Sequence, residues 1–201
     1  MSTTATFGTK PLTTASLVRN GGAFLIGAAA TALVLTAAAA FIDRSLARPG
    51  AGGYLASGIV MTLVDLFAAL GLTGLAGTDA VGPGRFKQLA FGLAIGGSFA
   101  MVPAEVLLRI DFATGNAAYG IVGPIQAIGL ILVGIGIVRA RRWSSWRRFV
   151  VLFWGIYVPA VMVPLLAASG GTSLVALAGY HGFALAAGVA YLGTTARTTR
   201  T

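Results

Sequence analysis

Residues Arg139 to Phe149 read Arg-Ala-Arg-Arg-Trp-Ser-Ser-Trp-Arg-Arg-Phe, and this stretch decides how the chain is arranged. It holds five of the 14 basic residues in eleven positions and separates two long apolar runs. Cytoplasmic loops between membrane-spanning helices are rich in arginine and lysine, and tryptophan is enriched at the membrane–water interface. The stretch therefore predicts a cytoplasmic loop between two membrane-spanning helices, with its tryptophans at the depth of the lipid headgroups.

The composition is that of an integral membrane protein. Hydrophobic residues make up 57% of the chain and charged residues 9%, and the mean hydropathy is +0.88. A soluble domain carries about 25% charged residues. The net charge of +9 lies in short loops and termini, which favours membrane topology over nucleic-acid binding. Cysteine is absent and histidine occurs once, so we expect no cofactor, disulfide or metal site.

Six apolar runs of about 20 residues follow one another, each long enough to cross a hydrocarbon core of roughly 30 Å. They predict an all-α bundle of six transmembrane helices within residues 21–193. Residues 1–20 and 194–201 are expected to be cytoplasmic tails, the first of them flexible. The expected helices are 21–42, 54–77, 88–108, 117–138, 150–168 and 173–193.

The distribution of positive charge predicts the orientation of this bundle. With the 139–149 loop inside the cell, eleven of the 14 basic residues lie on the cytoplasmic side. We therefore expect both termini in the cytoplasm. The alanine- and arginine-rich, lysine-poor composition fits a high-GC bacterium, and hence the bacterial inner membrane.

Two helical hairpins share short motifs, which suggests an internal parallel repeat. Arg85-Phe86-x-x-Leu89-x-x-Gly92 enters the third helix, and Arg148-Phe149-x-x-Leu152-x-x-Gly155 enters the fifth. Gly-Ile-Val opens the second helix at 58–60 and the fourth at 120–122. The repeat would relate helices 2–3 to helices 4–5. Coincidence in a chain so rich in glycine, alanine and valine is the alternative.

Ionisable residues inside the predicted helices are the first candidates for a site, because a charge near the bilayer centre is costly. Asp65 lies near the middle of the second helix. It could be a proton or cation site, a counter-charge for a ligand, or a protonated or hydrogen-bonded carboxyl that locks the second helix to a neighbour. Glu105 and Arg109 lie four residues apart on one face of the third helix. They could be a structural ion pair or part of an outward-facing binding vestibule.

Three further polar residues complete the set of candidate binding residues. Gln126 follows Pro124 in the fourth helix, Tyr157 lies in the fifth, and His181 in the sixth. The histidine could be an interhelical contact or part of a site. Pro159 and Pro164 predict a kink in the fifth helix, where backbone carbonyls without a helical donor could line a cavity.

Catalytic motifs are missing. A rhomboid-type intramembrane protease needs Gly-x-Ser-Gly at the start of the fourth helix, where this chain has Gly115-Asn116-Ala117-Ala118-Tyr119-Gly120. An aspartyl protease needs two facing carboxylates at one depth, and only Asp65 is central. Phosphate-binding and dinucleotide-binding fingerprints are also absent. These absences favour a protein that is not an enzyme, and no residue is proposed as catalytic.

The C-terminal half resembles uncharacterised small actinobacterial membrane proteins of a domain family of unknown function. The resemblance rests on Gly123-Pro124-x-Gln126 through Gly129, on Arg-Arg-Trp-x-x-Trp-Arg-Arg, and on Gly155-Ile-Tyr157, Pro164-Leu-Leu and Ala178-Gly-Tyr180. It covers about residues 120–187, and the N-terminal half departs further. The resemblance implies a six-helix membrane topology and carries no activity.

Two functional hypotheses follow, with a lipid- or isoprenoid-processing enzyme third. In the first, the bundle binds or transports a small molecule or ion in a cavity between helices 2, 3, 5 and 6. In the second, the chain is a structural or accessory subunit whose Arg/Trp loop docks a membrane-protein partner or anionic lipid. Self-association into a homo-oligomer is a further possibility. The candidate loop contacts are Arg139, Arg141, Arg142, Trp143, Trp146, Arg147 and Arg148.

Overall fold

The computed structural model describes residues 14–170 and 173–198, and within these ranges the chain is helical with no strand. Six helical spans are long and apolar enough to cross a membrane. The prediction of a multi-pass, all-α membrane protein is therefore confirmed. The spans are α1 (Thr14–Phe41), α2 (Gly52–Ala76), α3 (Arg85–Ile110), α4 (Phe112–Ala140), the composite α5–η2–α6 (Arg147–Ala168) and α7 (Leu174–Thr198).

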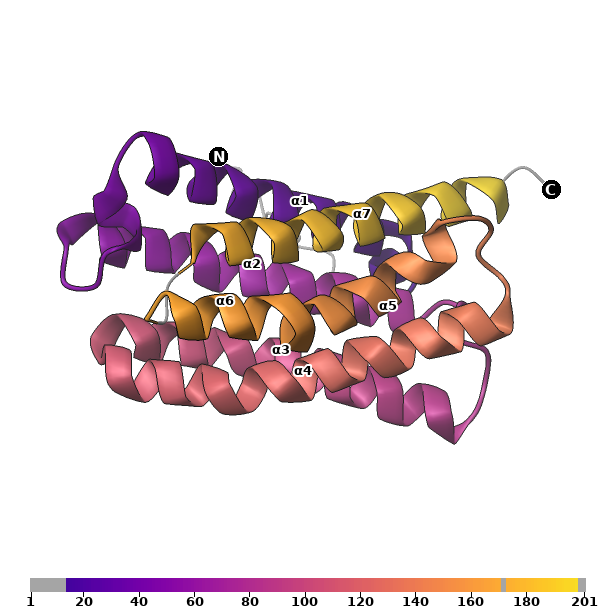
Figure 1. Cartoon of the computed structure of the whole chain (residues 1–201). Helices are drawn as coiled ribbons and strands as arrows, with labels where there is room; N and C mark the ends of the chain where they lie inside the picture. The colour runs from indigo at the N-terminus through magenta and orange to yellow at the C-terminus, as the bar shows by residue number, and fades with distance from the viewer. Residues whose placement is uncertain (1–13, 171–172, 199–201) are drawn as a thin grey trace, which may run out of the picture.

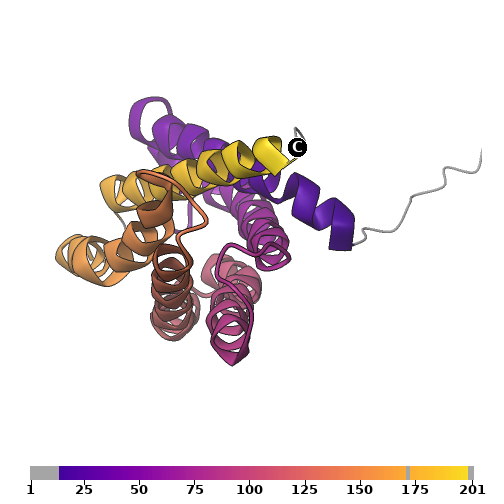
Figure 2. The same cartoon turned by 90° about the vertical axis from the view of Figure 1, so that its right-hand side faces the viewer.

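The spans form a closed ring in chain order (Figures 1 and 2). Each packs against the next one, and α7 returns to pack against α1. A short 3₁₀ helix, η1 (Arg44–Ala47), lies in the loop between α1 and α2. One end of the bundle carries the 77–84 and 141–146 loops, and we call it the basic end (right in Figure 1). The 42–51 loop and the α3–α4 turn lie at the opposite end.

Several helices extend beyond their predicted limits. Helix α1 begins at Thr14 instead of residue 21, and α7 continues to Thr198 instead of ending at 193. Residues 14–20 and 194–198 of the expected tails are thus helical. Residues 1–13 and 199–201 of the expected tails lie outside the described ranges.

The α3–α4 turn is the largest departure from the predicted boundaries. A loop over 110–116 was expected, but α3 ends at Ile110 and α4 begins at Phe112. Asp111 alone makes the turn: its N–H donates to the carbonyl of Leu107 at 2.8 Å. Its carboxylate accepts from the Ala113 N–H at 3.1 Å and from the Thr114 hydroxyl at 2.5 Å. This residue caps both helices, so the chain reverses within one residue.

The fifth span contains an irregular segment where its two prolines predicted one. Five residues, Val158–Met162, form a π-helical turn (η2) between α5 (Arg147–Tyr157) and α6 (Val163–Ala168). The backbone N–H of Val163 donates to the carbonyl of Val158. Pro159 and Pro164 cannot donate a backbone hydrogen bond, so the wider turn accommodates them while the span stays continuous.

The hydrophobic core lies toward the basic end. It is built from all six spans and closed by Val81 of the 77–84 loop and Trp143 of the 141–146 loop. Glycine brings the helices together: a side chain at Gly129 of α4 would put its Cβ 2.6 Å from the Cα of Ala94 on α3. Small residues allow such close backbone approach in membrane bundles. The fully buried members with the largest side chains are Trp154, Tyr191, Leu25, Leu72, Leu75, Leu130 and Ile137.

Candidate ion or small-molecule binding site

Four polar side chains from three helices meet between the bundle centre and the opposite end. Tyr119 of α4 donates its hydroxyl to Oε2 of Glu105 at 2.8 Å, and the same hydroxyl lies 3.3 Å from Oδ2 of Asp65 on α2. Arg109 donates its Nε to Oε1 of Glu105 at 2.8 Å, and its Nη2 donates to the same oxygen. We call these four residues the carboxylate cluster.

Helix α2 holds the arginine of this cluster in place. The guanidinium carbon of Arg109 lies 3.9 Å from the centroid of the Tyr54 ring. Its Nη1 donates to the Tyr54 carbonyl at 3.2 Å and approaches the Ser57 hydroxyl at 3.5 Å. A Cβ on Gly58 would lie 2.6 Å from the arginine side chain. The absence of a side chain at this position therefore makes room for the guanidinium.

The hydrogen bonds around Tyr119 require one more proton than two ionised carboxylates supply. A phenolic hydroxyl has one proton to donate, and ionised carboxylates can only accept. Tyr119 can therefore satisfy Glu105 or Asp65, but not both. If the Asp65 carboxyl is protonated it donates to the Tyr119 oxygen, and the chain Asp65–Tyr119–Glu105–Arg109 is then complete. A bound cation beside Asp65 would serve the same purpose.

Counting charges also identifies Asp65 as the carboxyl that needs a proton or a cation. Glu105 and Arg109 neutralise each other as an ion pair with side chains 4% and 13% exposed. Within the described part of the chain, no basic side chain forms an ion pair with Asp65. Glu105 is buried whereas Asp65 is half-buried. Asp65 is thus the less buried acidic member of the cluster and the one whose charge is not balanced.

A second polar group, the Gln126 network, lies deeper in the bundle. Tyr180 of α7 donates to Oε1 of Gln126 at 2.9 Å, and the Nε2 of Gln126 donates to the Ser98 hydroxyl at 2.8 Å. Ser98 in turn donates to the Ala94 carbonyl at 2.8 Å. Ser98 precedes Glu105 of the carboxylate cluster by seven residues on α3, which is about two helical turns. The two polar groups are therefore neighbours inside the ring.

The α3–α4 hairpin places both groups on one interface at regular spacing. Glu105 and Tyr119 lie seven residues either side of Phe112, and the bonded pair Ser98 and Gln126 lies fourteen residues either side. Seven residues are about two helical turns. Seven residues further from Phe112 in each direction lie Phe91 and Val133, which belong to the hydrophobic core. The interface thus changes from polar to apolar toward the basic end.

Two of the candidate binding residues lie outside both groups. Tyr157 donates to the carbonyl of Ala176 at 3.2 Å and packs its ring 5.3 Å from that of Phe183, so it joins α5 to α7. His181 is 4% exposed, and its ring lies edge-on to Tyr180 at 5.1 Å. The structure therefore gathers Asp65, Glu105 and Arg109, but it does not place Tyr157 in a common cavity with them.

The Arg/Trp loop differs from its prediction at one tryptophan. Trp143 is 4% exposed and part of the hydrophobic core, so the interpretation of it as a lipid or partner contact is wrong. A tryptophan ring buries a large apolar area and can contribute strongly to a core. Trp146, by contrast, is 51% exposed. The helices on either side also shorten the loop, because α4 runs to Ala140 and α5 begins at Arg147.

The arginines of this loop divide into exposed and anchored side chains. Arg147 donates Nη1 to the Gly193 carbonyl at 3.1 Å, which ties α5 to α7. Arg148 lies 4.7 Å from the centroid of the Phe149 ring. Arg142 approaches Asp79 of the neighbouring loop at 3.9 Å, with both side chains largely exposed. The arginines that remain exposed are Arg139, Arg141 and Arg142.

The sequence did not mark as candidates the tyrosines and serines that connect the charged groups. Tyr119, Tyr54 and Ser57 read as ordinary helix residues, because nothing in the local pattern marks them. The signal that could have identified Tyr119 and Ser98 is the hairpin register, which requires the position of the turn. With Asp111 taken as the whole turn, the partners of Glu105 and Gln126 follow from symmetry about Phe112.

Metal ligands do not gather at either group. Within the described ranges, no three His, Cys, Asp or Glu side chains lie close enough together to hold a metal ion.

Comparison of the chain with protein-family models, curated proteins and solved structures returned no match. The resemblance of residues 120–187 to actinobacterial membrane proteins and the hairpin repeat both stay predictions.

Proposed function

We propose that the protein binds a proton or small cation at Asp65 and carries it, alone or with a small solute, through the helix bundle. The observation that supports this function is the Tyr119 hydroxyl, which lies within hydrogen-bond distance of two carboxyl groups but has one proton. Ionisable groups at this depth are costly and commonly mark ion or proton pathways. Asp65 takes the role of the titrating group, and Tyr119 connects it to the Glu105–Arg109 pair.

The arrangement favours access from the opposite end of the bundle. The carboxylate cluster lies on that side, and the Gln126 network extends the polar interface inward. Beyond it, the interface is closed by Phe91, Val133 and the rest of the hydrophobic core. Transport would therefore require a rearrangement that opens the basic end. The π-helical turn of the fifth span is a suitable hinge for this rearrangement, because its backbone is not held in a regular α-helical pattern.

Proton uptake into proteoliposomes tests this function. Purified protein is reconstituted with a pH-sensitive dye inside the vesicles, and a potassium diffusion potential drives uptake. We expect flux with the wild-type protein and its loss in Asp65→Asn, while Asp79→Asn, which removes an exposed carboxyl at the basic end, keeps it. Infrared spectra near neutral pH should show a protonated carboxyl band that Asp65→Asn removes. Absence of both the flux and this band would contradict the proposal.

A second candidate function is that of an accessory subunit that docks a partner or anionic lipid through the 141–146 loop. It is favoured by the exposed Arg139, Arg141, Arg142 and Trp146, which gather at one end of the bundle. Clusters of basic residues next to a membrane helix attract anionic lipid headgroups. A partner protein that co-purifies with the wild type and is lost when the three arginines are replaced by glutamine would support this role.

The same charge distribution supports a bacterial inner-membrane location with the basic end in the cytoplasm. The described basic side chains at this end include Arg19, Arg85 and Lys87 in addition to the loop arginines. Arg44, Arg48 and Arg109 lie toward the other end, beside Asp43 and Asp111. Labelling of single cysteines introduced at Ser45 and Ser144, in intact cells, tests this orientation. Ser45 should react with a membrane-impermeant thiol reagent and Ser144 should not.

A further inference from the structure

The surroundings of Asp65 determine which cation its carboxylate can hold. Helix α2 packs against α1, α3 and η1, and Tyr119 reaches it from α4. In the part of the chain that the structure describes, the Tyr119 hydroxyl is the one group that forms a hydrogen bond with the Asp65 side chain. The oxygens gathered at this point are therefore the two carboxylate oxygens of Asp65 and one hydroxyl.

The other carboxylate of the cluster is already occupied. Oε1 of Glu105 accepts from Nε and Nη2 of Arg109, and Oε2 accepts from Tyr119 at 2.8 Å. The same tyrosine hydroxyl lies 3.3 Å from Oδ2 of Asp65, so it contacts both carboxyl groups. A metal ion that bridged Asp65 and Glu105 would have to displace this hydroxyl. A proton requires no displacement, since it fits the existing contact between Asp65 and Tyr119.

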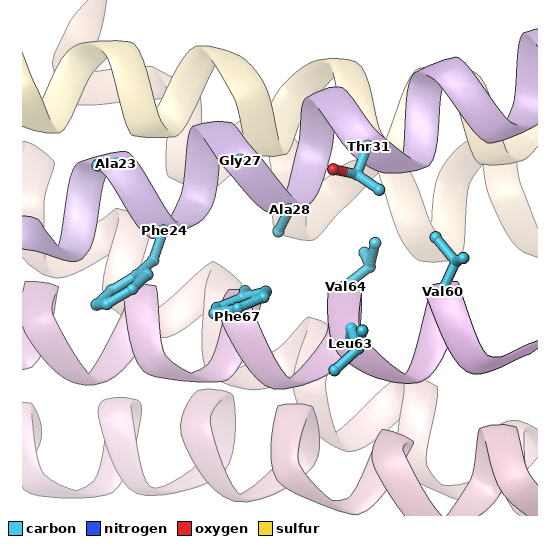
Figure 3. A pocket seen from close by; sticks show the side chains of 9 residues that line it. All are labelled: Ala23, Phe24, Gly27, Ala28, Thr31, Val60, Leu63, Val64 and Phe67. Carbon is cyan, nitrogen blue, oxygen red and sulfur yellow. The ribbon is translucent and has the colours of Figure 1, made fainter. Parts of the chain in front are cut away.

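The side of α2 that faces α1 adds no further ligand. Val64, the residue before Asp65, is 3% exposed and packs with Ala28 and Ala32 of α1. A cavity of about 350 Å³ also lies between these two helices (Figure 3). Thr31 is the one residue with a polar side chain among those that line it, and Thr31 is exposed. Asp65 is not among the lining residues, so this apolar cavity does not supply its ligands.

The charge of the cluster limits the choice of cation. With Asp65 ionised, the cluster contains two carboxylates and one guanidinium, hence a net charge of −1. Residues 20–41 of α1 contain no ionisable side chain, and η1, which carries Arg44, contacts α2 at Ser57, about 12 Å from Asp65 along the helix. A proton or a monovalent ion makes the cluster neutral. A divalent ion would leave a positive charge among apolar helices, which is costly.

Backbone carbonyls do not replace the missing ligands. Sodium sites in membrane transporters use the carbonyls of unwound helix segments. Helix α2 is continuous on both sides of Asp65, and a continuous helix uses its carbonyls in hydrogen bonds between successive turns. Pro103 of α3 and Pro124 of α4 each remove one backbone donor. The carbonyls that lose a donor belong to Phe99 and Gly120, which are both exposed and lie outside the carboxylate cluster.

We propose that the cation bound at Asp65 is a proton, and that sodium, potassium and divalent metal ions do not compete for the site. A metal ion leaves water only where a shell of oxygen ligands replaces its hydration, about six for a hard divalent ion. A proton needs one acceptor beside the carboxyl, and the Tyr119 oxygen supplies it. This inference rests on the function proposed above, because it names the ion that the same carboxyl binds.

An infrared titration of the full-length protein in proteoliposomes tests this selectivity. The band of the protonated Asp65 carboxyl, assigned by its loss in Asp65→Asn, is followed against pH in choline chloride. Choline is then replaced by sodium, potassium or calcium at constant ionic strength, because charge interactions depend on screening. We expect the same midpoint in every salt. A competing cation would instead lower the midpoint by about one pH unit for each tenfold rise in its concentration.

Two tyrosine variants provide a matched comparison. Tyr119→Phe removes the hydrogen-bond partner of Asp65 and should move the midpoint by the same amount in sodium as in choline. Tyr157→Phe removes a hydroxyl that donates to the Ala176 carbonyl elsewhere in the bundle, and it should leave the midpoint unchanged. Where Asp65→Asn does not fold, Asp65→Glu assigns the band by shifting its frequency.

The possible failures separate this inference from the proposed function. A midpoint that falls as sodium or potassium is raised would overturn the proton assignment, but Asp65 would still be a cation site. An unchanged midpoint in Tyr119→Phe would also overturn it, because the proton would then not lie in the contact between Asp65 and Tyr119. A carboxyl band that neither Asp65 substitution affects would contradict the titrating role of Asp65, and with it both the inference and the proposed function.

Discussion

The Tyr119 hydroxyl on α4 lies 2.8 Å from Oε2 of Glu105 and 3.3 Å from Oδ2 of Asp65 on α2. Helices α2 and α4 both pack against α3, so this side chain connects three consecutive spans. The hydroxyl can donate to one carboxylate at a time. Where its proton lies determines which of the two carboxyl groups needs another proton or a cation. The link between Tyr119 and Asp65 is thus the most direct target for mutagenesis.

Replacing Tyr119 by phenylalanine should destabilise the bundle and uncouple Asp65 from Glu105. A hydrogen bond to a charged group contributes about 1.5–3 kcal/mol, and its loss leaves a buried Glu105 oxygen without this donor. We expect a decrease in unfolding free energy of about 2 kcal/mol in Tyr119→Phe. Denaturant unfolding in mixed micelles, followed by circular dichroism, measures it.

The coupling is isolated by a double-mutant cycle with Asp65→Asn. If Tyr119 and Asp65 interact, the two substitutions together should cost less than the sum of the single effects. Additive effects would contradict the shared-proton arrangement. Tyr157→Phe removes a tyrosine hydroxyl that donates to a backbone carbonyl elsewhere in the bundle, and it should show no coupling to Asp65→Asn.

Neutralising one partner of the Glu105–Arg109 pair should be more harmful than neutralising both. Arg109→Gln leaves a buried carboxylate without its cation, a change that typically costs about 3–5 kcal/mol. In the double variant Glu105→Gln/Arg109→Gln, no charge is left unpaired, and we expect most of this loss to be recovered. Thermal unfolding of the single and double variants in one detergent gives the comparison. Equal stability of Arg109→Gln and the double variant would show that the ion pair is not buried in solution.

Gly129 and Gly92 should respond in opposite ways to the same substitution. Gly129→Ala places a Cβ against the backbone of Ala94, and overpacking of this kind costs about 1–3 kcal/mol. Gly92→Ala adds a Cβ into open space, and alanine favours the helix by up to about 1 kcal/mol. The difference in melting temperature between the two variants measures the close packing of α3 on α4. A tolerated Gly129→Ala would contradict the close backbone approach of these two helices.

Asp111 should make the α3–α4 turn sensitive to acid. The hydrogen bond from the Thr114 hydroxyl, followed by backbone donors including Ala113, lowers the pKa of its carboxyl from the usual 3.8. Since the folded carboxyl is harder to protonate than the unfolded one, its contribution is complete above the unfolded pKa. The contribution is lost as the pH falls through the lower folded pKa. A carboxyl-carbon NMR titration measures this pKa, and Thr114→Val should raise it. An unchanged value in Thr114→Val would exclude the hydroxyl as the cause.

The number of spans and their order followed from the sequence because the length of each apolar run can be read directly along the chain. Helix ends were less accurate, since capping decides them. Asp111 alone replaces an expected loop of several residues, and its ability to cap two helices depends on geometry that the local pattern does not show. The error in the start of α4, expected at residue 117 and found at Phe112, had a consequence. Because of this error, the sequence did not predict that Glu105 and Tyr119 face each other across the α3–α4 hairpin.

The candidate site was predicted in part. Asp65, Glu105 and Arg109 were identified by their charge, because any ionisable group in an apolar helix is conspicuous. Gln126 was identified as polar, but its partners Ser98 and Tyr180 were not. Trp143 lies in the core and Tyr157 lies apart from the carboxylate cluster, and neither position could be predicted from the sequence. Aromatic residues suit an interface, a cavity or a core equally well, and packing against distant segments determines which one they occupy.

The depth of Asp65 has an electrical consequence. Asp65 is close to the midpoint of α2, which contains 25 residues. A proton that reaches it from either side of the membrane crosses about half of the transmembrane voltage. A full crossing at 100 mV corresponds to about 2.3 kcal/mol per elementary charge, so half of it is about 1 kcal/mol. Occupancy of Asp65 would therefore follow the membrane potential as well as the pH, and an energised cell would fill or empty this carboxyl by changing its voltage alone.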